Sequence, residues 1–346
     1  MHDFPLTIDK LEQALGKAKD LRIAVVGDLF LDRYLHIDRT LDEDSIETGE
    51  TAYQVTRVIA SPGAAGTVIN NLSALGVGCI LPVAFIGDDG EGYELLQALR
   101  RTAGVVTDHV VTTRERRTPT YTKPMHLHAD GKPVEGNRLD IRNRQGTPQT
   151  VIDSLKQEIR ALWPTLDGVI ILDQVGDPTT GVITDEMAHH LAELAQTDPG
   201  VVTLADSRER IGVFHHLALK PNQRETLRAS GLPDNATDQQ LEAAIQKLAL
   251  KGAPVFCTRA EEGIILAEGN GKPLRRVRGV AVLGPIDPVG AGDSTSAGIV
   301  LGQTSGLDAA ESAALGCLVA SITVQKIGTT GTASPGELRE ALKLLN

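Results

Sequence analysis

Hydrophobic positions follow two rhythms along most of the chain. Short continuous apolar runs are typical of strands buried on both faces, and apolar residues three or four positions apart are typical of helices with one buried face. Buried strands are predicted at 23–26, 79–87, 168–173, 200–206 and 253–259, and amphipathic helices at 66–76, 90–104, 184–196 and 239–252. This alternation predicts an α/β fold, a doubly wound and mostly parallel sheet with helices on both faces.

Two segments depart from this rhythm, at about 32–60 and 113–145. They are polar, rich in threonine and arginine, and contain pieces of strand-like alternation at 52–60 and 118–128. We predict that they form a small β-sheet lid on the α/β body, with a turn at 128–138.

Alternation along 52–60 predicts that one face of this strand is more apolar than the other. The more apolar face consists of Tyr53, Val55, Arg57 and Ile59. A small open sheet has exposed edges and needs its apolar face covered. A second copy of the lid would cover it, so we predict a homodimer that pairs through the lids.

Composition narrows the range of partners and compartments. The chain has 346 residues, which we interpret as one domain, 1–346, with the lid inserted. Its net charge of −11 argues against a nucleic-acid or anionic-membrane surface. No signal peptide and no membrane-spanning apolar run are recognisable, and the three cysteines lack metal-site spacing. These features predict a cytoplasmic protein with buried thiols.

Candidate chemistry gathers where the predicted strands end, because parallel strands bring their carboxyl ends to one edge of the sheet. Asp28, Asp173, Asp206 and Thr258 all lie at such ends. The stretch IDPVGAGDSTSAGIVLG, 286–302, joins this edge as a glycine-rich turn that opens a helix. Its backbone N–H groups would bind an anion. Asp293 would accept a proton from an attacking hydroxyl, or it would simply cap the helix.

Several motifs resemble the PfkB/ribokinase family of ATP-dependent carbohydrate kinases. DPVGAGDSTSAG (287–298) resembles the C-terminal signature, SPGAAGTVINNLSALG (61–76) the N-terminal one, and KPNQRE (220–225) and CTRAEEGIILAE (257–268) two elements between them. Within the family, VVGDLFLDRY, TPTYTKP…NRLDIR and VQKIGTTGTASPGEL most resemble the kinase domain of bifunctional heptose-7-phosphate kinase/adenylyltransferases. The resemblance covers nearly the whole chain and implies the ribokinase-like fold.

The resemblance also implies roles on the nucleotide side. It makes Asp293 the catalytic base and Gly290, Ala291 and Gly292 the anion hole. It assigns Asn222, Glu225, Thr258, Gly263 and Cys317 to the nucleotide, and Mg²⁺ to Glu225, partly through water. Asp287 is similar to the position near a monovalent-cation loop, with K⁺ as the cofactor, although an Asp that caps a turn is an equal alternative.

On the sugar side, the resemblance assigns substrate binding to Asp28, Asp32, Gly63, Ala64 and Thr67. The family usually has Gly at the position of Ala64 and Asn at the position of Thr67, and the heptose kinases tend to have Asn where Cys317 stands. Arg208 would contact a substrate phosphate or form a surface salt bridge.

The resulting prediction is an ATP-dependent kinase acting on a sugar or sugar phosphate, which would be the small-molecule partner. A nucleoside kinase of the same family is one alternative, although the lid offers few aromatic residues, chiefly Tyr34, Tyr53 and Tyr121. A non-catalytic sugar or nucleotide sensor is the other. The pairs His189–His190 and His215–His216 are not interpreted as a metal site, because adjacent helical residues diverge by about 100°.

Overall fold

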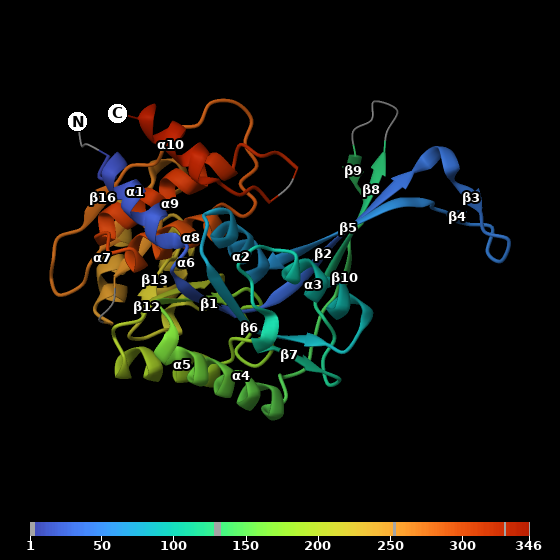
Figure 1. Ribbon diagram of the computed structural model, residues 1–346, viewed down its shortest axis with the longest axis horizontal. Helices are drawn as coiled ribbons and strands as arrows, with labels where there is room; N and C mark the ends of the chain where they lie inside the picture. The colour runs from blue at the N-terminus through green and yellow to red at the C-terminus, as the bar shows by residue number, and fades with distance from the viewer. Residues whose placement is uncertain (1–3, 128–132, 252–253, 329, 346) are drawn as a thin grey trace.

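The computed structural model describes residues 4–127, 133–251, 254–328 and 330–345, and its centre is a nine-stranded sheet (Figure 1). The spatial order of its strands is β16 (Arg275–Val277), β15 (Ile264–Ala267), β14 (Val255–Thr258), β13 (Ala218–Leu219), β12 (Val202–Ser207), β11 (Gly168–Asp173), β1 (Arg22–Gly27), β6 (Cys79–Gly87) and β7 (Val110–Thr113). Neighbours from β14 to β7 are parallel, and β15 and β16 are antiparallel. The predicted fold class, a mostly parallel sheet, is confirmed.

Helices cover both faces of this sheet. Figure 1 shows α4 and α5 on one face and α1, α2, α8 and α9 on the other. The helices are α1 (Ile8–Ala18), α2 (Ala65–Ala74), α3 (Gly90–Arg100), α4 (Gln149–Leu162), α5 (Asp185–Thr197), α6 (Gln223–Ala229), α7 (Asp238–Ala249), α8 (Ala291–Thr304), α9 (Ala309–Thr323) and α10 (Pro335–Lys343). Both α8 and α9 are buried along most of their length, because they lie between the sheet and other helices. No helix in the described part of the chain is long and apolar enough to cross a bilayer.

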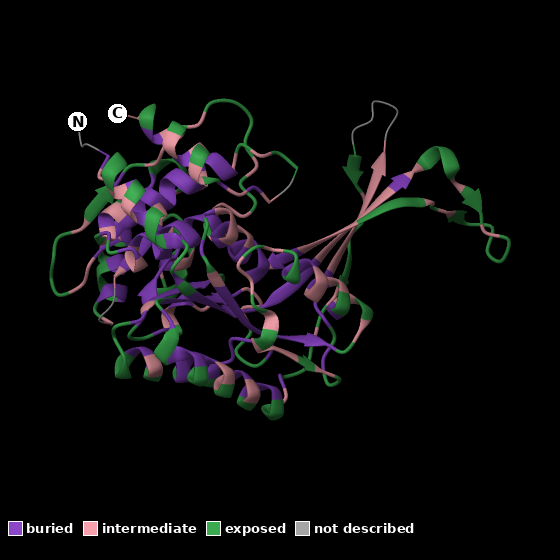
Figure 2. Ribbon diagram, in the orientation of Figure 1, coloured by how far each residue is buried: buried purple, intermediate pink, exposed green. Residues whose placement is uncertain are grey.

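A second sheet extends away from the body (Figure 1), and we call it the lid sheet. Its strands are β10 (Leu139–Ile141), β8 (Thr120–Leu127), β2 (Leu29–Asp38) and β5 (Val55–Ala64), with β9 (Pro133–Glu135) paired to β8. A two-stranded piece, β3 (Glu43–Asp44) and β4 (Thr51–Ala52), lies beyond the far end of β2. Figure 2 shows that the lid strands are mostly half-buried or exposed, whereas the body strands are buried.

Most predicted elements occur within a few residues of their expected limits, but two details of the lid differ. Part of the predicted turn at 128–138 is the strand β9, while residues 128–132 lie outside the described residues. Three other predicted elements also reach residues outside the described ones. They are the strand-like piece at 118–128, the helix at 239–252 and the strand at 253–259.

The predicted apolar face of the lid is wrong. Strands β2 and β5 pair with a register shift between His36 and Ile37, which sets Ile59 opposite Tyr34 and Val55 opposite Ile37. Directly paired residues of antiparallel strands share a face, and side chains alternate along β2. Ile59 and Val55 therefore lie on opposite faces. A β-bulge inserts an extra residue and breaks the alternation that the prediction assumed.

Candidate active site

The N-terminus of α8 forms the turn predicted to bind an anion. Gly290 is the N-cap residue in a left-handed conformation, with φ of 81°, and Ala291 and Gly292 begin the helix. The amide of Ala291 donates to the Pro288 carbonyl, whereas the Gly292 and Asp293 amides have no backbone partner among the described residues. Such unpaired amides at a helix start attract negative charge.

Asp293 lies in this first turn and is half-buried. Burial and the negative charge of Asp206 raise the pKa of its carboxyl to about 7, although Lys220 and Arg208 act in the opposite direction. Gly290 occupies the cap position, and α8 has no side-chain capping bond. The capping alternative for Asp293 is therefore wrong, and the carboxyl is poised to exchange a proton near neutral pH.

Lys220 is a site residue that the sequence analysis missed. It is buried at the end of β13, and its Nζ lies 2.9 Å from Asp206 Oδ2. A Cβ on Gly292 would lie 3.5 Å from the same nitrogen, so the ammonium group is beside the first turn of α8. Its pKa stays raised by Asp206 despite the opposing effect of burial. The strand β13 is too short to show in the hydrophobic pattern, and this hid the position of Lys220 at the sheet edge.

Asn222 and Glu225 form a capping box at the start of α6. The Asn222 side chain accepts from the Glu225 amide (2.8 Å), and one oxygen of Glu225 accepts from the Asn222 amide (2.7 Å). Burial, aided by Asp206, raises the pKa of Glu225 to about 7, even though the Asn222 amide lowers it. Asn222 also forms a β-bridge with Thr258, which brings these three predicted nucleotide-side residues together.

Two other residues predicted on the nucleotide side have clear packing roles. Gly263 lies in the turn before β15, where a Cβ would be only 2.2 Å from the Val277 carbonyl oxygen. Cys317 is buried on α9, and burial raises the pKa of its thiol to about 12. It is therefore a neutral thiol at physiological pH.

Asp287 caps the turn that precedes α8. One of its oxygens accepts from the Val289 amide at 3.1 Å and the other from the Gly328 amide at 3.3 Å. These are the contacts expected of the turn-capping alternative. Among the described residues, no group of three or more His, Cys, Asp or Glu side chains is arranged to hold a metal ion.

On the substrate side, the structure brings Asp32 and Gly63 into contact across β2 and β5. A Cβ on Gly63 would lie 2.4 Å from Asp32 Oδ2, so a side chain there would force the Asp32 carboxylate to move. Lys123 of β8 lies 3.5 Å from Asp32 Oδ1, and its ammonium also donates to the Tyr34 hydroxyl at 3.2 Å. Burial raises the pKa of Asp32, and Lys123 partly opposes that change.

Ala64 and Thr67 lie at the start of α2, next to the α8 turn. Ala64 is the N-cap residue with φ of 53° and ψ of −116°, and such a positive φ is strained for a residue with a Cβ. Thr67 is buried, and its methyl carbon would be 3.3 Å from a Cβ on Gly290. The predicted sugar side and the predicted anion hole are thus neighbours.

Asp28 is buried between the body and the lid, and both of its oxygens are occupied. They accept hydrogen bonds from the backbone amides of Gln174 and Val175, both at 3.1 Å, and of Val182 at 2.7 Å. Burial raises the pKa of Asp28 to about 6, although these amides lower it. These contacts show that the Asp28 carboxylate fixes the backbone of the segment 174–182.

A cavity of about 260 Å³ lies between the body and the lid sheet. Its lining includes Asp28, Phe30, Tyr121, Arg142 and Arg208. The charge of Arg208 also acts on Asp293, so Arg208 lies close to both the cavity and the α8 turn. The guanidinium of Arg208 forms no ion pair with another described residue, and the predicted surface salt bridge is not observed.

The His189 and His190 side chains diverge as expected. The His189 side chain is 77% exposed and that of His190 is 3% exposed. His189, His215 and His216 line one hollow beside α5, outside the site described above.

Comparison with known proteins identifies the C-terminal part of the chain. Residues 182–335 match the family described as pfkB family carbohydrate kinase. Residues 182–335 are a PfkB-family domain. The matched segment contains the motifs at 220–225, 257–268 and 287–298, whereas the glycine-rich stretch at 61–76 precedes it.

Curated relatives of this chain are longer than the chain itself. It is 33% identical over 346 residues to the bifunctional protein HldE of Trichlorobacter lovleyi and 29% identical over 343 residues to that of Pelobacter propionicus. Each match covers 96% of this chain but only 65% and 66% of the respective relative. The chain therefore spans about two thirds of the length of these relatives.

Solved structures similar to this chain agree on the ribokinase-like fold. A ribokinase from Arabidopsis thaliana complexed with ribose and ATP has a TM-score of 0.67 at 20% identity, covering 93% of this chain and 99% of that chain. Phosphofructokinase-2 from Escherichia coli with substrates and products has a TM-score of 0.68 at 15% identity, covering 94% and 99%.

Proposed function

We propose that the chain is an ATP-dependent kinase that phosphorylates a hydroxyl group of a sugar or sugar phosphate. The observation that carries this proposal is the position of Asp293. Its carboxyl has a pKa of about 7 and lies beside two backbone amides that have no backbone partner in the described part of the chain. A base of this pKa can take up a hydroxyl proton near neutral pH, and the amides favour negative charge next to it.

In the proposed reaction, Asp293 accepts the proton of the attacking hydroxyl. The amides of Gly292 and Asp293 donate to the phosphoryl oxygens, where negative charge spreads during transfer. Lys220 adds a fixed positive charge beside Gly292. ATP, when bound, supplies the phosphoryl group.

The residues around α6 fit an Mg²⁺–nucleotide complex. One oxygen of Glu225 is used in the capping box, and the other has no partner among the described residues. Mg²⁺ usually keeps several waters and takes few protein oxygens, so one free carboxylate oxygen suits it. Asn222 and Thr258 would lie near the nucleotide. Each Asp287 oxygen keeps a lone pair beyond its amide bond, so K⁺ at this turn is part of the proposal.

On the acceptor side, Asp32 would hold hydroxyl groups of the sugar, with Gly63 leaving room for its carboxylate. Arg142 and Arg208 line the cavity and would favour a phosphate on the acceptor. The nucleoside alternative needs a free aromatic face. The Tyr121 ring is instead contacted edge-on by Phe30 and covered by the guanidinium of Arg138, 4.1 Å from the ring centroid. A sugar or sugar phosphate therefore suits the cavity better.

We also propose a homodimer that pairs through the lids. Strand β5 is an edge of the lid sheet, and Val55 and Val58 on it are 43% and 48% exposed. Exposed apolar strands at a sheet edge are normally covered. A second lid would cover this surface.

The test of the function is ADP release from ATP and Mg²⁺ with a panel of acceptors: ribose, fructose 6-phosphate, a heptose 7-phosphate and adenosine. We expect release with at least one sugar or sugar phosphate, and none with adenosine. Release with adenosine alone would establish the nucleoside kinase. Binding of an acceptor with no release for any of the four would favour the sensor.

A further inference from the structure

One wall of the cavity is the segment between β11 and α5, residues 174–184, which we call the β11–α5 loop. Four of its residues, Gln174, Val175, Gly181 and Val182, line the cavity. The opposite wall includes Phe30 and Tyr121 of the lid sheet. The conformation of this loop therefore sets the shape that an acceptor meets.

Asp28 fastens both ends of the β11–α5 loop. Its carboxylate accepts from Gln174 and Val175 at the start of the loop and from Val182 near its end. A Cβ on Gly181, whose φ is 84°, would lie 2.7 Å from Asp28 Oδ1, so the loop can close on this carboxylate only with glycine there. A buried carboxylate with several backbone donors is a strong, fixed anchor.

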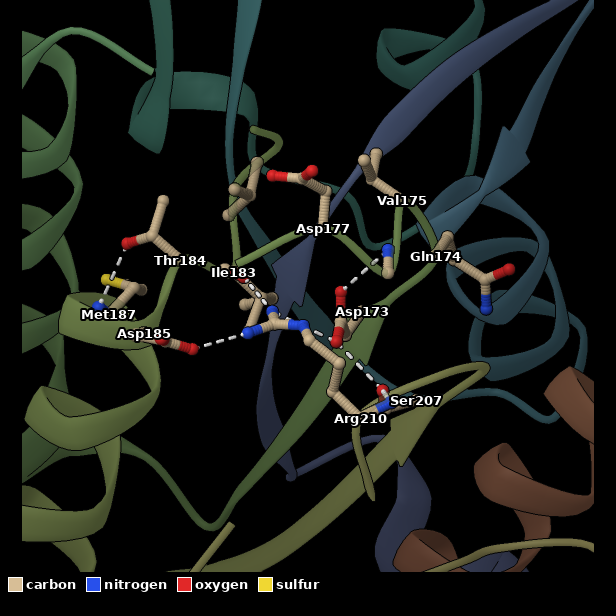
Figure 3. Close-up of polar contacts among 12 residues, drawn as sticks. Asp173, Gln174, Val175, Asp177, Ile183, Thr184, Asp185, Met187, Ser207 and Arg210 are labelled. Carbon is tan, nitrogen blue, oxygen red and sulfur yellow. Dashed lines mark hydrogen bonds and ion pairs between the residues drawn. The ribbon is translucent and has the colours of Figure 1, made fainter. Parts of the chain in front are cut away.

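Arg210 forms a second fastening on the other side of the loop (Figure 3). Its guanidinium lies 3.1 Å from Asp173, which precedes the loop, and 2.7 Å from Asp185, which follows it. It also donates to the Ile183 carbonyl. Asp173 is held in turn by the Ser207 hydroxyl at 2.8 Å. Asp28 and Arg210 thus each fix both ends of the loop, through separate contacts.

Gln174 is the exception in this well-bonded segment. Its carboxamide oxygen is buried and has no hydrogen-bond partner among the described residues. Figure 3 shows the side chain directed away from the Asp173–Arg210 cluster. An unpaired buried polar atom is costly, and the cost is recovered when a ligand supplies the missing partner. A hydroxyl group, which both donates and accepts, suits either end of a carboxamide.

We propose that Gln174 is a specificity-determining residue whose carboxamide forms a hydrogen bond with a hydroxyl of the acceptor. Asp28 and Arg210 are positioning residues, because they hold the loop in the conformation that this hydrogen bond needs. The proposal rests on the kinase function proposed above. Sites built to bond a hydroxyl reject analogues that lack it, because the polar group of the site is then left unpaired.

The test is Gln174→Met, which keeps the size of the side chain and removes its polar atoms. We use the best acceptor among ribose, fructose 6-phosphate and a heptose 7-phosphate. We expect its KM to rise by about tenfold with the KM for ATP unchanged, since one neutral hydrogen bond is lost. The thermal midpoint without ligand should not fall, because the removed oxygen had no partner.

The matched control is Gln303→Met. Its carboxamide oxygen is also buried and unpaired among the described residues, but it lies near the opposite end of α8 from Asp293. It should leave both KM values unchanged. Arg210→Met should raise the acceptor KM and speed amide exchange in 174–183, whereas Arg339→Met, which removes a bidentate pair with Glu12, should do neither.

Three outcomes separate the proposals. If the wild type is active and Gln174→Met keeps its acceptor KM, the role of Gln174 is wrong and the kinase function stands. A large loss of stability in Gln174→Met would also overturn it, because the carboxamide would then be a structural partner. If the wild type phosphorylates none of the acceptors, the proposed function fails, and this inference fails with it.

Discussion

The body sheet and the lid sheet treat their charged residues differently. All residues of β11 are buried, whereas all residues of β9 are exposed and β8 is mostly half-buried. In the body, burial and close charges raise the pKa values of Asp293 and Glu225 to about 7. In the lid, Arg138 and Asp140 pair near the surface, where ion pairs contribute little, and the more buried Asp32 is paired with Lys123. The body therefore fits the proposed proton transfer, whereas the lid fits the proposed recognition of the acceptor.

Replacing Asp293 should have the largest effect, because it removes the proposed proton acceptor from the body. Asp293→Asn should reduce kcat by roughly 10² to 10⁴-fold, the usual contribution of a general base. ATP binding should survive, since the amides of the α8 turn remain. ADP release gives kcat, and calorimetry gives the ATP affinity. Turnover at the wild-type rate would refute the assignment.

The pH profile provides the control for that variant. A base with a pKa of about 7 must be deprotonated to act, so wild-type kcat should fall below pH 7, and the residual activity of Asp293→Asn should not follow this curve. The folded-state pKa is raised above the unfolded value, so ionisation of Asp293 costs stability fully above pH 7 and progressively less toward pH 4. Asp293→Asn should therefore raise the thermal midpoint at pH 8 more than at pH 5.

Replacing Asp32 tests recognition by the lid. Asp32→Ala should weaken acceptor binding by roughly 1.5–3 kcal/mol for each charge-assisted hydrogen bond lost. ATP binding should change little, because Asp32 lies on the lid sheet. Calorimetry with each ligand separately measures both effects. Arg33→Met is the matched control, since Arg33 is next along β2 and its side chain pairs with Glu94 on α3. Equal losses for ATP and acceptor would make Asp32 structural.

Ala64 lies where lid and body join, and its backbone is strained. We therefore expect its replacement to have a smaller effect, a gain of stability where the replacements above cause losses of activity or binding. Ala64→Gly should raise the free energy of unfolding by about 1 kcal/mol, because a positive φ is costly for a residue with a Cβ and not for glycine. Ala74→Gly, at the last residue of α2, should instead lower it. Urea unfolding compares the two variants, and a destabilised Ala64→Gly would show that the Ala64 methyl group packs favourably.

The smallest effect on turnover is expected from the outer face of the lid. Val58 pairs with Leu35, on the face opposite Ile59 and Asp32. Val58→Asp should yield monomers with a modestly raised acceptor KM, since the paired lids would no longer support each other. Ile59→Asp should affect the acceptor directly through its position on the face of Asp32. Light scattering after size exclusion measures the oligomeric state. A fully active wild-type monomer at micromolar concentration would contradict the proposed dimer.

The fold was predictable from the sequence wherever burial is complete. Continuous apolar runs mark β6 and β11, and the glycine-rich stretch at 286–302 marks the start of α8. The contribution of Lys220 was not predictable, because β13 is too short to leave a pattern. The faces of β5 were not predictable either, since the bulge opposite His36 depends on pairing between distant strands. The roles of Asp28 and Gln174 depend on a loop closure that no local pattern records.

The body sheet and the lid sheet are joined by very short backbone segments. Only Asp28 separates β1 from β2, and β5 ends at Ala64 directly before α2. These two crossing points are adjacent, because the Ala65 amide donates to the Asp28 carbonyl at 3.0 Å. A rotation of the lid relative to the body would change the backbone torsions at these two crossing points, together with those of the connections at 114–119 and 142–148. Because Asp28 lies at one of these crossing points and also holds the β11–α5 loop, we expect a rotation of the lid to disturb the loop as well.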